Sequence, residues 1–138
     1  MNKRVYDENA RAFEDRTRDY LQKHILADAE LFLKNLSGYA ILDLGSGPGR
    51  DSLFFRERGM RPLCFDISHE MVSLCKEKGL EAREGDLENP DIEDASFDGV
   101  WAYTSLLHMP KKNLPSALRH VARILKPNGV FYIGMKEG

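Results

Sequence analysis

The sequence lacks the features that mark several classes of protein. It has only two cysteines, Cys64 and Cys75, and their spacing matches neither a disulfide framework nor a zinc site. No apolar run approaches the roughly 18 residues that a membrane-spanning helix needs, and no apolar signal core follows the basic pair near the N-terminus. These absences predict a cytoplasmic protein with reduced thiols, no bound metal and no membrane partner.

An excess of charge of one sign is also missing. The 20 Lys and Arg residues are opposed by 22 Asp and Glu residues, which gives a formal net charge of −2, and the two signs are interspersed. Without a basic excess, nucleic acid is not expected as a partner. The 138 residues suffice for one domain with a sizeable core, and 42% hydrophobic residues are typical of a globular protein.

What the sequence does contain is organised around residues 41–52, Ile-Leu-Asp-Leu-Gly-Ser-Gly-Pro-Gly-Arg-Asp-Ser. The short apolar run Ile41–Leu44 predicts a buried strand of a parallel sheet. Three glycines then occupy alternate positions: Gly45, Gly47 and Gly49. Because glycine lacks a Cβ, such a turn lets a ligand touch the backbone. A helical pattern begins near Arg50, so the segment predicts a site for a nucleotide-like ligand, with an ordinary ligand-free turn as the alternative.

The rest of the chain alternates apolar strands with helical patterns. Strands are expected at 62–66, 80–83, 97–102 and 130–135, and helices at about 50–59, 68–79 and 113–126. Residues 3–36 are expected to form two N-terminal helices. The pattern predicts an α/β fold with a doubly wound, mainly parallel, Rossmann-like sheet of about five strands. The buried face of the last helix is expected to consist of Leu114, Leu118, Val121 and Leu125.

The glycine turn resembles motif I of the class I S-adenosylmethionine-dependent methyltransferases, in which an acidic residue, here Asp43, precedes G-x-G-x-G. A dinucleotide-binding turn reads G-x-G-x-x-G, but here the third glycine comes one position early and Arg50 takes the sixth position. Further segments resemble motifs of the small-molecule methyltransferases, in the same order: Tyr6-Asp7-x-x-Ala10-x-x-Phe13, residues 84–87 (Glu-Gly-Asp-Leu), residues 96–100 (Ser-Phe-Asp-Gly-Val) and residues 125–129 (Leu-Lys-Pro-Asn-Gly). The resemblance covers Tyr6 to Met135 and implies S-adenosylmethionine as the cofactor.

The resemblance also implies roles for individual residues. The glycine turn would hold the methionine part of the cofactor, and Arg50 would reach its carboxylate, unless Arg50 is simply a solvated helix residue. Asp66 would accept hydrogen bonds from the ribose diol, with an acid at a helix N-terminus as the alternative. Asp86 and the amide of Leu87 would hold the adenine, with turn chemistry as the alternative. The remaining cofactor-binding residues are expected to be Asp43, Ile67, Met71 and Ala102.

Methyl transfer from a sulfonium mainly requires donor and acceptor to be positioned and water to be excluded. An amine or hydroxyl acceptor must also lose a proton, so a general base is needed. The first candidate for this catalytic role is His108, followed by Tyr103 and Tyr6; the alternative for His108 is packing at a helix boundary. No Asn-Pro-Pro-Tyr sequence follows the fourth strand, which disfavours adenine and glutamine methylases and favours a small-molecule acceptor.

The chain also departs from the resemblance. Similar methyltransferases continue through two further strands, whereas this chain stops at Gly138, as expected of a fragment or a naturally short protein. Three functions therefore remain: a small-molecule methyltransferase, a cofactor-binding domain that is inactive alone, and a nicotinamide-dependent oxidoreductase, which the glycine spacing disfavours.

The ends of the chain carry two more expectations. Residues 1–36 are expected to form a helical lid over residues 37–138, although packing on the domain is the alternative for their aromatic stripe. The apolar segment Val130–Met135 would be an exposed sheet edge and is expected to pair with a second copy, giving a homodimer. The alternative is that the N-terminal helices cover this edge.

Overall fold

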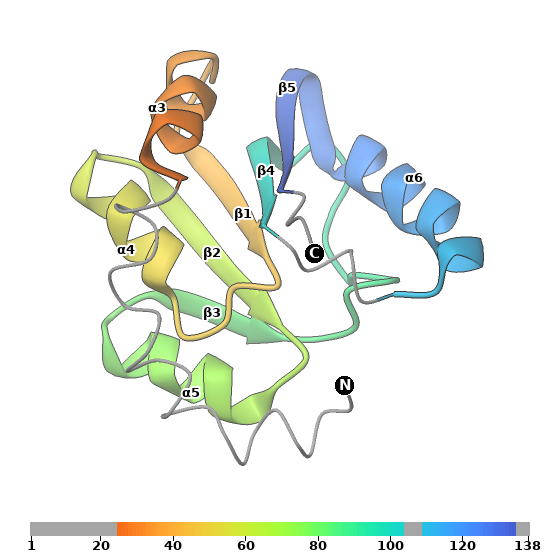
Figure 1. Cartoon of the computed structure of the whole chain (residues 1–138), viewed down its shortest axis with the longest axis horizontal. Coiled ribbons are helices and arrows are strands. Elements are labelled where there is room, and N and C mark those ends of the chain that lie inside the picture. Colours follow the sequence, from red (N-terminus) through yellow and green to blue (C-terminus); the bar gives the residue numbers. More distant parts are fainter. Residues whose placement is uncertain (1–24, 104–108, 135–138) are drawn as a thin grey trace.

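The computed structural model describes residues 25–103 and 109–134. Within them, five parallel strands form one sheet in the order β3-β2-β1-β4-β5 (Figure 1). The strands are β1 (Ala40–Leu44), β2 (Arg61–Asp66), β3 (Glu81–Glu84), β4 (Phe97–Tyr103) and β5 (Leu125–Gly134). The chain moves outward from β1 to β3 and then returns to place β4 on the other side of β1. The predicted α/β, doubly wound parallel sheet is therefore confirmed.

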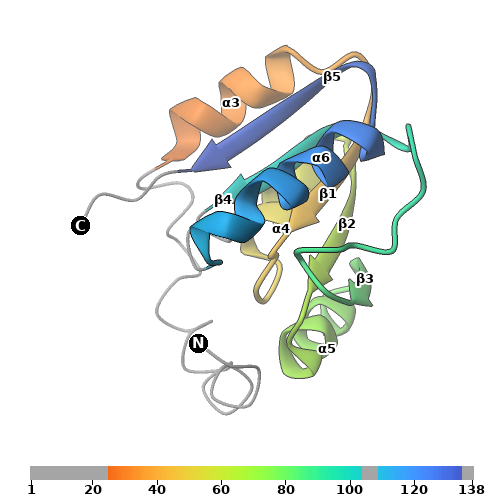
Figure 2. The same cartoon turned by 90° about the vertical axis from the view of Figure 1, so that its right-hand side faces the viewer.

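Helices cover both faces of this sheet, as Figure 2 shows with α6 on one side and α4 on the other. The helices described are α3 (Leu26–Lys34), α4 (Arg50–Glu57), α5 (His69–Glu77) and α6 (Leu114–Ile124), with a short 3-10 helix η3 (Lys111–Asn113) before α6. Side chains alternate along a strand, so β1 serves both layers. Ile41 packs with the aromatic side chains of α3 and α4, whereas Leu42 and Leu44 pack with α6.

An aromatic cluster attaches α3 to the sheet. Trp101 of β4 stacks on Tyr132 of β5 with ring centroids 4.0 Å apart, and Phe32 of α3 meets the Trp101 ring edge-on at 5.2 Å. Ile25 and Ala29 are buried on the same side of α3 as Phe32, as the helical spacing predicts. The described part of the lid expected at residues 1–36 thus packs on the sheet face beside β5, and residues 1–24 of that lid lie outside the described residues.

Helix α6 differs from its prediction in which side chains it buries. Its buried residues are Ala117, Val121 and Ile124, whereas Leu118 is 39% exposed. The strand also begins earlier than expected, because Leu125 already pairs with Phe97. The predicted turn at 126–129 is instead an irregularity within β5, where the register shifts before Val130. Because α6 ends at Ile124 and β5 begins at Leu125, the face of α6 that carries Ala117, Val121 and Ile124 is turned toward the sheet.

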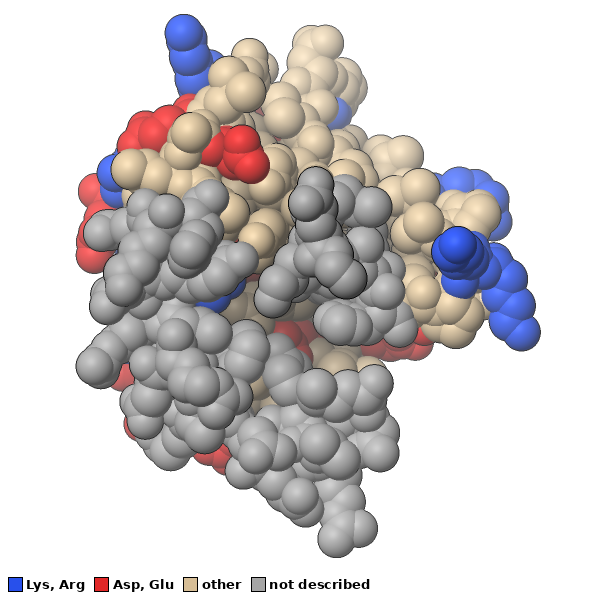
Figure 3. All heavy atoms as spheres, in the orientation of Figure 1, with Lys and Arg blue, Asp and Glu red and all other residues tan. Residues whose placement is uncertain are grey.

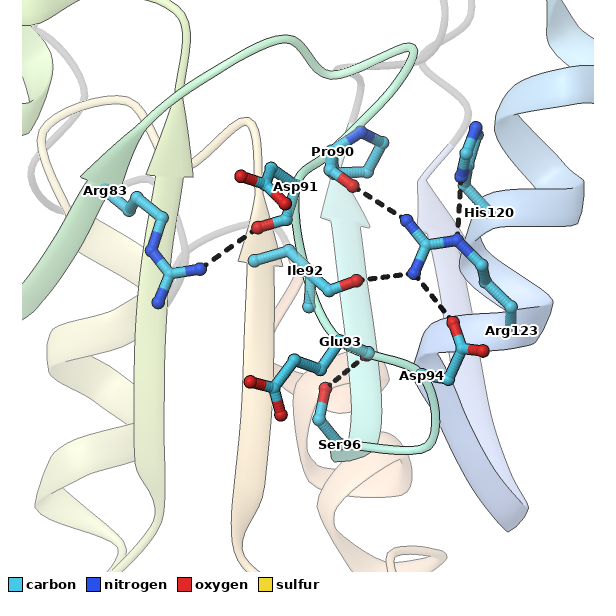
Figure 4. Close-up of polar contacts among 9 residues, drawn as sticks. All are labelled: Arg83, Pro90, Asp91, Ile92, Glu93, Asp94, Ser96, His120 and Arg123. Atoms are coloured by element: carbon cyan, nitrogen blue, oxygen red, sulfur yellow. Dashed lines mark hydrogen bonds and ion pairs between the residues drawn. The ribbon is translucent and has the colours of Figure 1, made fainter.

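The connection from β3 to β4, residues 85–96, contains no helix and is held by Arg123 of α6 (Figure 4). The Arg123 guanidinium donates hydrogen bonds to the carbonyls of Pro90 and Ile92 and forms an ion pair with Asp94 at 3.0 Å. Its Nε donates to His120 Nδ1 at 2.9 Å. One side chain of α6 therefore holds residues 90–94 of the loop.

None of the helices in residues 25–103 and 109–134 is both long and apolar enough to cross a bilayer.

Candidate cofactor site

The candidate site lies at the carboxyl ends of β1, β2 and β4, where the strand order reverses (Figure 1). In a doubly wound sheet, the crevice at this reversal is where ligands bind. The glycine turn follows β1, Asp66 ends β2 and Tyr103 ends β4. The fold therefore brings together residues that are far apart in the sequence.

The glycine turn has a backbone that only glycine adopts readily. Gly45, Gly47 and Gly49 have φ values of 81°, 57° and 92°, all in the left-handed region. A Cβ on Gly49 would lie 2.6 Å from Leu80 Cδ1 and 3.1 Å from Cys75 Sγ. The turn thus needs glycine at position 49 both for its conformation and for its close packing.

Helix α5 anchors the turn from below. The thiol of Cys75 donates to the Gly47 carbonyl at 3.2 Å, and Lys78 Nζ donates to the Pro48 carbonyl at 2.8 Å. Hydrogen bonding to Cys75 and burial raise the pKa of the Cys64 thiol well above its usual range. Cys64 is fully buried, so its protonated thiol is a packing group and not a nucleophile.

Asp66 links the glycine turn to the start of α5. The side chain is 2% exposed, and its Oδ2 accepts a hydrogen bond from Gly47 N at 2.9 Å while its Oδ1 accepts from Ser68 N at 2.9 Å. The Ser68 hydroxyl in turn accepts a hydrogen bond from Met71 N at 3.1 Å and so caps α5 at the start of the helix predicted over 68–79. A carboxylate oxygen can accept more than one hydrogen bond, as the predicted contact with a ribose requires. That contact stays a prediction.

Asp43 lies beneath the turn and fixes the helix that follows it. The carboxylate is buried, and its Oδ2 accepts a hydrogen bond from the Ser52 hydroxyl of α4 at 2.7 Å. Burial raises the pKa of Asp43 well above its usual value of 3.8, and the nearby Asp51 carboxylate raises it further.

The sequence reasoning missed Asp51, which proves to be central. Arg50 Nε donates to Asp51 Oδ1 at 2.9 Å, and the Trp101 indole nitrogen donates to Asp51 Oδ2 at 2.7 Å. Asp51 is 5% exposed, and Arg50 is held beside the turn and not simply solvated. The one signal in the sequence is that its single Trp, in a buried strand, needs an acceptor for its N–H.

The predicted adenine corner adjoins Asp66. Gly85 N donates to the Asp66 carbonyl at 2.9 Å, and Asp86 Oδ1 accepts from Glu88 N at 2.9 Å. Asp86 therefore takes part in a turn, which was the alternative to a role in adenine binding. Its contact with adenine stays a prediction. Leu87 is half-buried against the core beside α6.

The other predicted cofactor contacts differ in exposure. Ile67, just after Asp66, is 42% exposed, whereas Met71 and Ala102 are fully buried. Ile67 thus offers surface to a ligand at the end of β2. The roles of all three toward the cofactor stay predictions.

Of the catalytic candidates, only Tyr103 can be placed. It is half-buried at the end of β4, and its ring packs so closely on Gly134 that a Cβ there would collide with it. His108 and Tyr6 lie outside the described residues. In the described ranges no three His, Cys, Asp or Glu side chains are grouped as metal ligands.

Comparison with known proteins agrees with this geometry. A family model described as a methyltransferase domain matches residues 41–129. A putative S-adenosylmethionine-dependent methyltransferase from Methanococcus maripaludis has a similar fold, with a TM-score of 0.79, 23% identity, and coverage of 93% of this chain and 63% of that one.

Two curated relatives are enzymes with different acceptors. A malonyl-[acyl-carrier protein] O-methyltransferase from Pectobacterium atrosepticum is 35% identical over 96 residues, 68% of this chain and 37% of the relative. A tRNA (carboxymethyluridine(34)-5-O)-methyltransferase from Arabidopsis thaliana is 32% identical over 108 residues, 74% of this chain and 25% of the relative. The chain thus spans less than half the length of these relatives.

Proposed function

Because this chain belongs to the class I S-adenosylmethionine-dependent methyltransferases, we propose that it methylates a small-molecule acceptor with S-adenosylmethionine. The observation that carries the proposal is the glycine turn at the strand-order reversal, held by Asp66 on one side and α5 on the other. All three of its glycines have φ values in the left-handed region, and Gly49 is also packed too closely on Leu80 and Cys75 to carry a side chain. Such a turn suits the methionine part of the cofactor.

The proposed residue roles follow the elements of the site. Arg50, fixed by Asp51, would hold the carboxylate of the cofactor, and Asp66 its ribose. Asp86, Leu87 and the exposed Ile67 would surround the adenine. The bound cofactor supplies an electrophilic methyl group, and the protein positions the acceptor in line with it and keeps water out.

A base is required only for some acceptors. A hydroxyl or amine must lose a proton at the reacting atom, and we assign this task to His108, with Tyr103 and Tyr6 as the next candidates. A carboxylate acceptor is already deprotonated at neutral pH and needs no base. The dependence of the rate on these side chains therefore reports the class of acceptor.

The alternative is a cofactor-binding domain that is inactive alone. The chain covers 37% and 25% of the lengths of the two enzymes, so their whole activity is not carried over to it. Their different acceptors also mean that the relatives do not select one substrate class for this chain.

Calorimetric titration and a methylation screen test the proposal. S-adenosylhomocysteine should bind and NAD should not, and labelled S-adenosylmethionine should transfer its methyl group to one of a panel of carboxylic acids, phenols and amines. Binding without transfer to any acceptor would favour the inactive domain. If NAD binds and S-adenosylhomocysteine does not, the methyltransferase function is rejected.

Two further proposals concern assembly. The first is that the part of the expected N-terminal lid that precedes α3, residues 1–24, caps the cofactor. The second is that the free edge of β5 pairs with β5 of a second copy. Within the described residues β5 pairs only with β4, which supports the second proposal. Light scattering should give a dimer mass, and S-adenosylhomocysteine should slow hydrogen exchange in residues 3–20. A monomer, or unchanged exchange, would reject the respective proposal.

A further inference from the structure

Three exposed cations lie along η3 and α6: Lys111 and Lys112 in η3, and Arg119 in the middle of α6. Among the residues that the structure describes, none of the three side chains has a hydrogen-bond or ion-pair partner. All other arginines within 25–103 and 109–134 donate to a carboxylate or a carbonyl, as Arg58 does to Glu30 and Arg56 to the Lys78 carbonyl. Arg119 is thus exceptional in the described part of the chain. Figure 3 shows Lys and Arg side chains gathered on the side of the molecule where α6 lies.

Apolar surface lies among these cations. Leu118, adjacent to Arg119, is one of the few large hydrophobic side chains that the fold leaves exposed. Pro115 and Ala122 are also exposed, and with Leu118 they follow the three-to-four-residue spacing of one helix face. An apolar centre with a charged rim is the usual composition of a protein-binding surface.

This face adjoins the candidate site. A helix that connects two parallel strands runs against them, so α6 begins at the sheet edge where β4 ends. Asn113 Nδ2 donates to Glu88 Oε1 at 2.7 Å, and Glu88 N donates to Asp86 Oδ1 at 2.9 Å. Two hydrogen bonds therefore join the start of α6 to the predicted adenine corner.

The surrounding charges select the kind of partner. The loop that α6 holds carries the exposed acids Asp91, Glu93 and Asp94 (Figure 4), and the chain as a whole has a net charge of −2. A long polyanion such as RNA gains little from three cations on a chain of negative net charge with an acidic loop beside the same helix. A compact acidic surface with one apolar contact matches the three cations and Leu118.

We propose that the face formed by Lys111, Lys112, Leu118 and Arg119 docks a small acidic protein that carries the methyl acceptor. The proposal rests on the proposed function and deepens it, because the small-molecule acceptor would reach this edge attached to the partner and not free in solution. The carboxylates of the partner would pair with the three cations, and an apolar side chain would cover Leu118.

The experiment titrates the protein with fluorescently labelled acyl carrier protein, a small acidic helical domain, at low ionic strength. Lys111→Glu/Lys112→Glu and, separately, Arg119→Glu should weaken binding by about tenfold or more, and salt should weaken wild-type binding. The matched control is Lys34→Glu/Lys76→Glu, which reverses two exposed cations of α3 and α5. Neither has a side-chain partner in the described part of the chain, and this variant should change binding by less than about twofold.

Binding of S-adenosylhomocysteine is measured on every variant and should not change, so a failure of docking can be told from a failure of the proposed function. No binding of the carrier protein would overturn the docking proposal. So would equal loss in the control variant, which would report net charge alone, or tighter binding of a duplex RNA through the same three residues.

Discussion

The indole nitrogen of Trp101 donates a 2.7 Å hydrogen bond to Asp51 across 50 positions of sequence. Trp101 lies in the centre of β4, and Asp51 lies in the first turn of α4, directly after the glycine turn. The other oxygen of Asp51 holds Arg50. The core of the sheet is thus connected by one carboxylate to the side chain that we assign to the cofactor.

Trp101→Phe should destabilise the protein by about 1–3 kcal/mol, because a buried oxygen of Asp51 loses its donor. Urea unfolding measures the change. The control Tyr132→Phe removes a hydrogen bond to the exposed Asp28, and should cost less than about 0.5 kcal/mol. Equal effects of the two substitutions would contradict the importance of the buried bond.

Arg123→Ala should cost about 2–3 kcal/mol, because two loop carbonyls and Asp94 lose a charged donor. Hydrogen exchange in residues 88–96 should rise at the same time. Arg119→Ala, on the same helix but without a partner, is the matched control and should change stability by less than about 0.5 kcal/mol. A stable variant with an unchanged loop would show that Arg123 does not fix this segment.

Asp43 should make the protein less stable as the pH rises. Since its pKa is raised in the folded state, the folded protein holds this proton more firmly than the unfolded chain. The resulting stability is fully present below the ordinary value of 3.8 and is lost as the pH rises toward the folded-state pKa. Asp43→Asn removes the titration. Between about pH 4 and pH 8, the melting temperature of the wild type should therefore decrease relative to that of the variant. If the two melting temperatures change in parallel with pH, the pKa of Asp43 is not raised by folding.

Two glycine substitutions separate backbone strain from close packing. Gly59→Ala places a Cβ in open space at a φ of 84° and should cost about 1–2 kcal/mol. Gly49→Ala, at a φ of 92°, adds contact with Leu80 and Cys75 and should cost more. It should also weaken the binding of S-adenosylhomocysteine, whereas Gly59→Ala should not. Unfolding curves and calorimetry measure both, and identical behaviour of the two variants would show that the glycine turn tolerates a side chain.

Asp66→Ala should weaken binding of S-adenosylhomocysteine by roughly 1.5–3 kcal/mol, the range for a hydrogen bond to a charged group. It also removes the acceptor of Gly47 N, so the turn itself should loosen. Ser68→Ala is the control, because it removes the cap of α5 and leaves the carboxylate in place. If wild type and Asp66→Ala bind equally, the ribose does not lie at Asp66.

The local elements were predictable because neighbouring residues determine them. Apolar runs bounded by glycine predicted β1, and Ser68 predicted the start of α5, since a cap depends on residues three positions apart. The order of these elements predicted a doubly wound parallel sheet, because right-handed crossovers leave few other arrangements. The glycine spacing predicted the family of the chain. The sequence by itself thus determined the fold class, the position of the glycine turn and the cofactor that its family uses.

Only the tertiary structure decided which distant groups meet. Nothing in the local pattern pairs Trp101 with Asp51 or Arg123 with the 85–96 loop, because these contacts depend on how elements cross in space. The prediction that Leu118 is buried was wrong for the same reason. Periodicity gives the spacing of a helix face, but the end of α6 and the start of β5 decide which way that face is turned. The hydrogen bond that Asp66 accepts from Gly47 N also required the fold, because the two residues lie at the ends of different strands, whereas the one from Ser68 N is local.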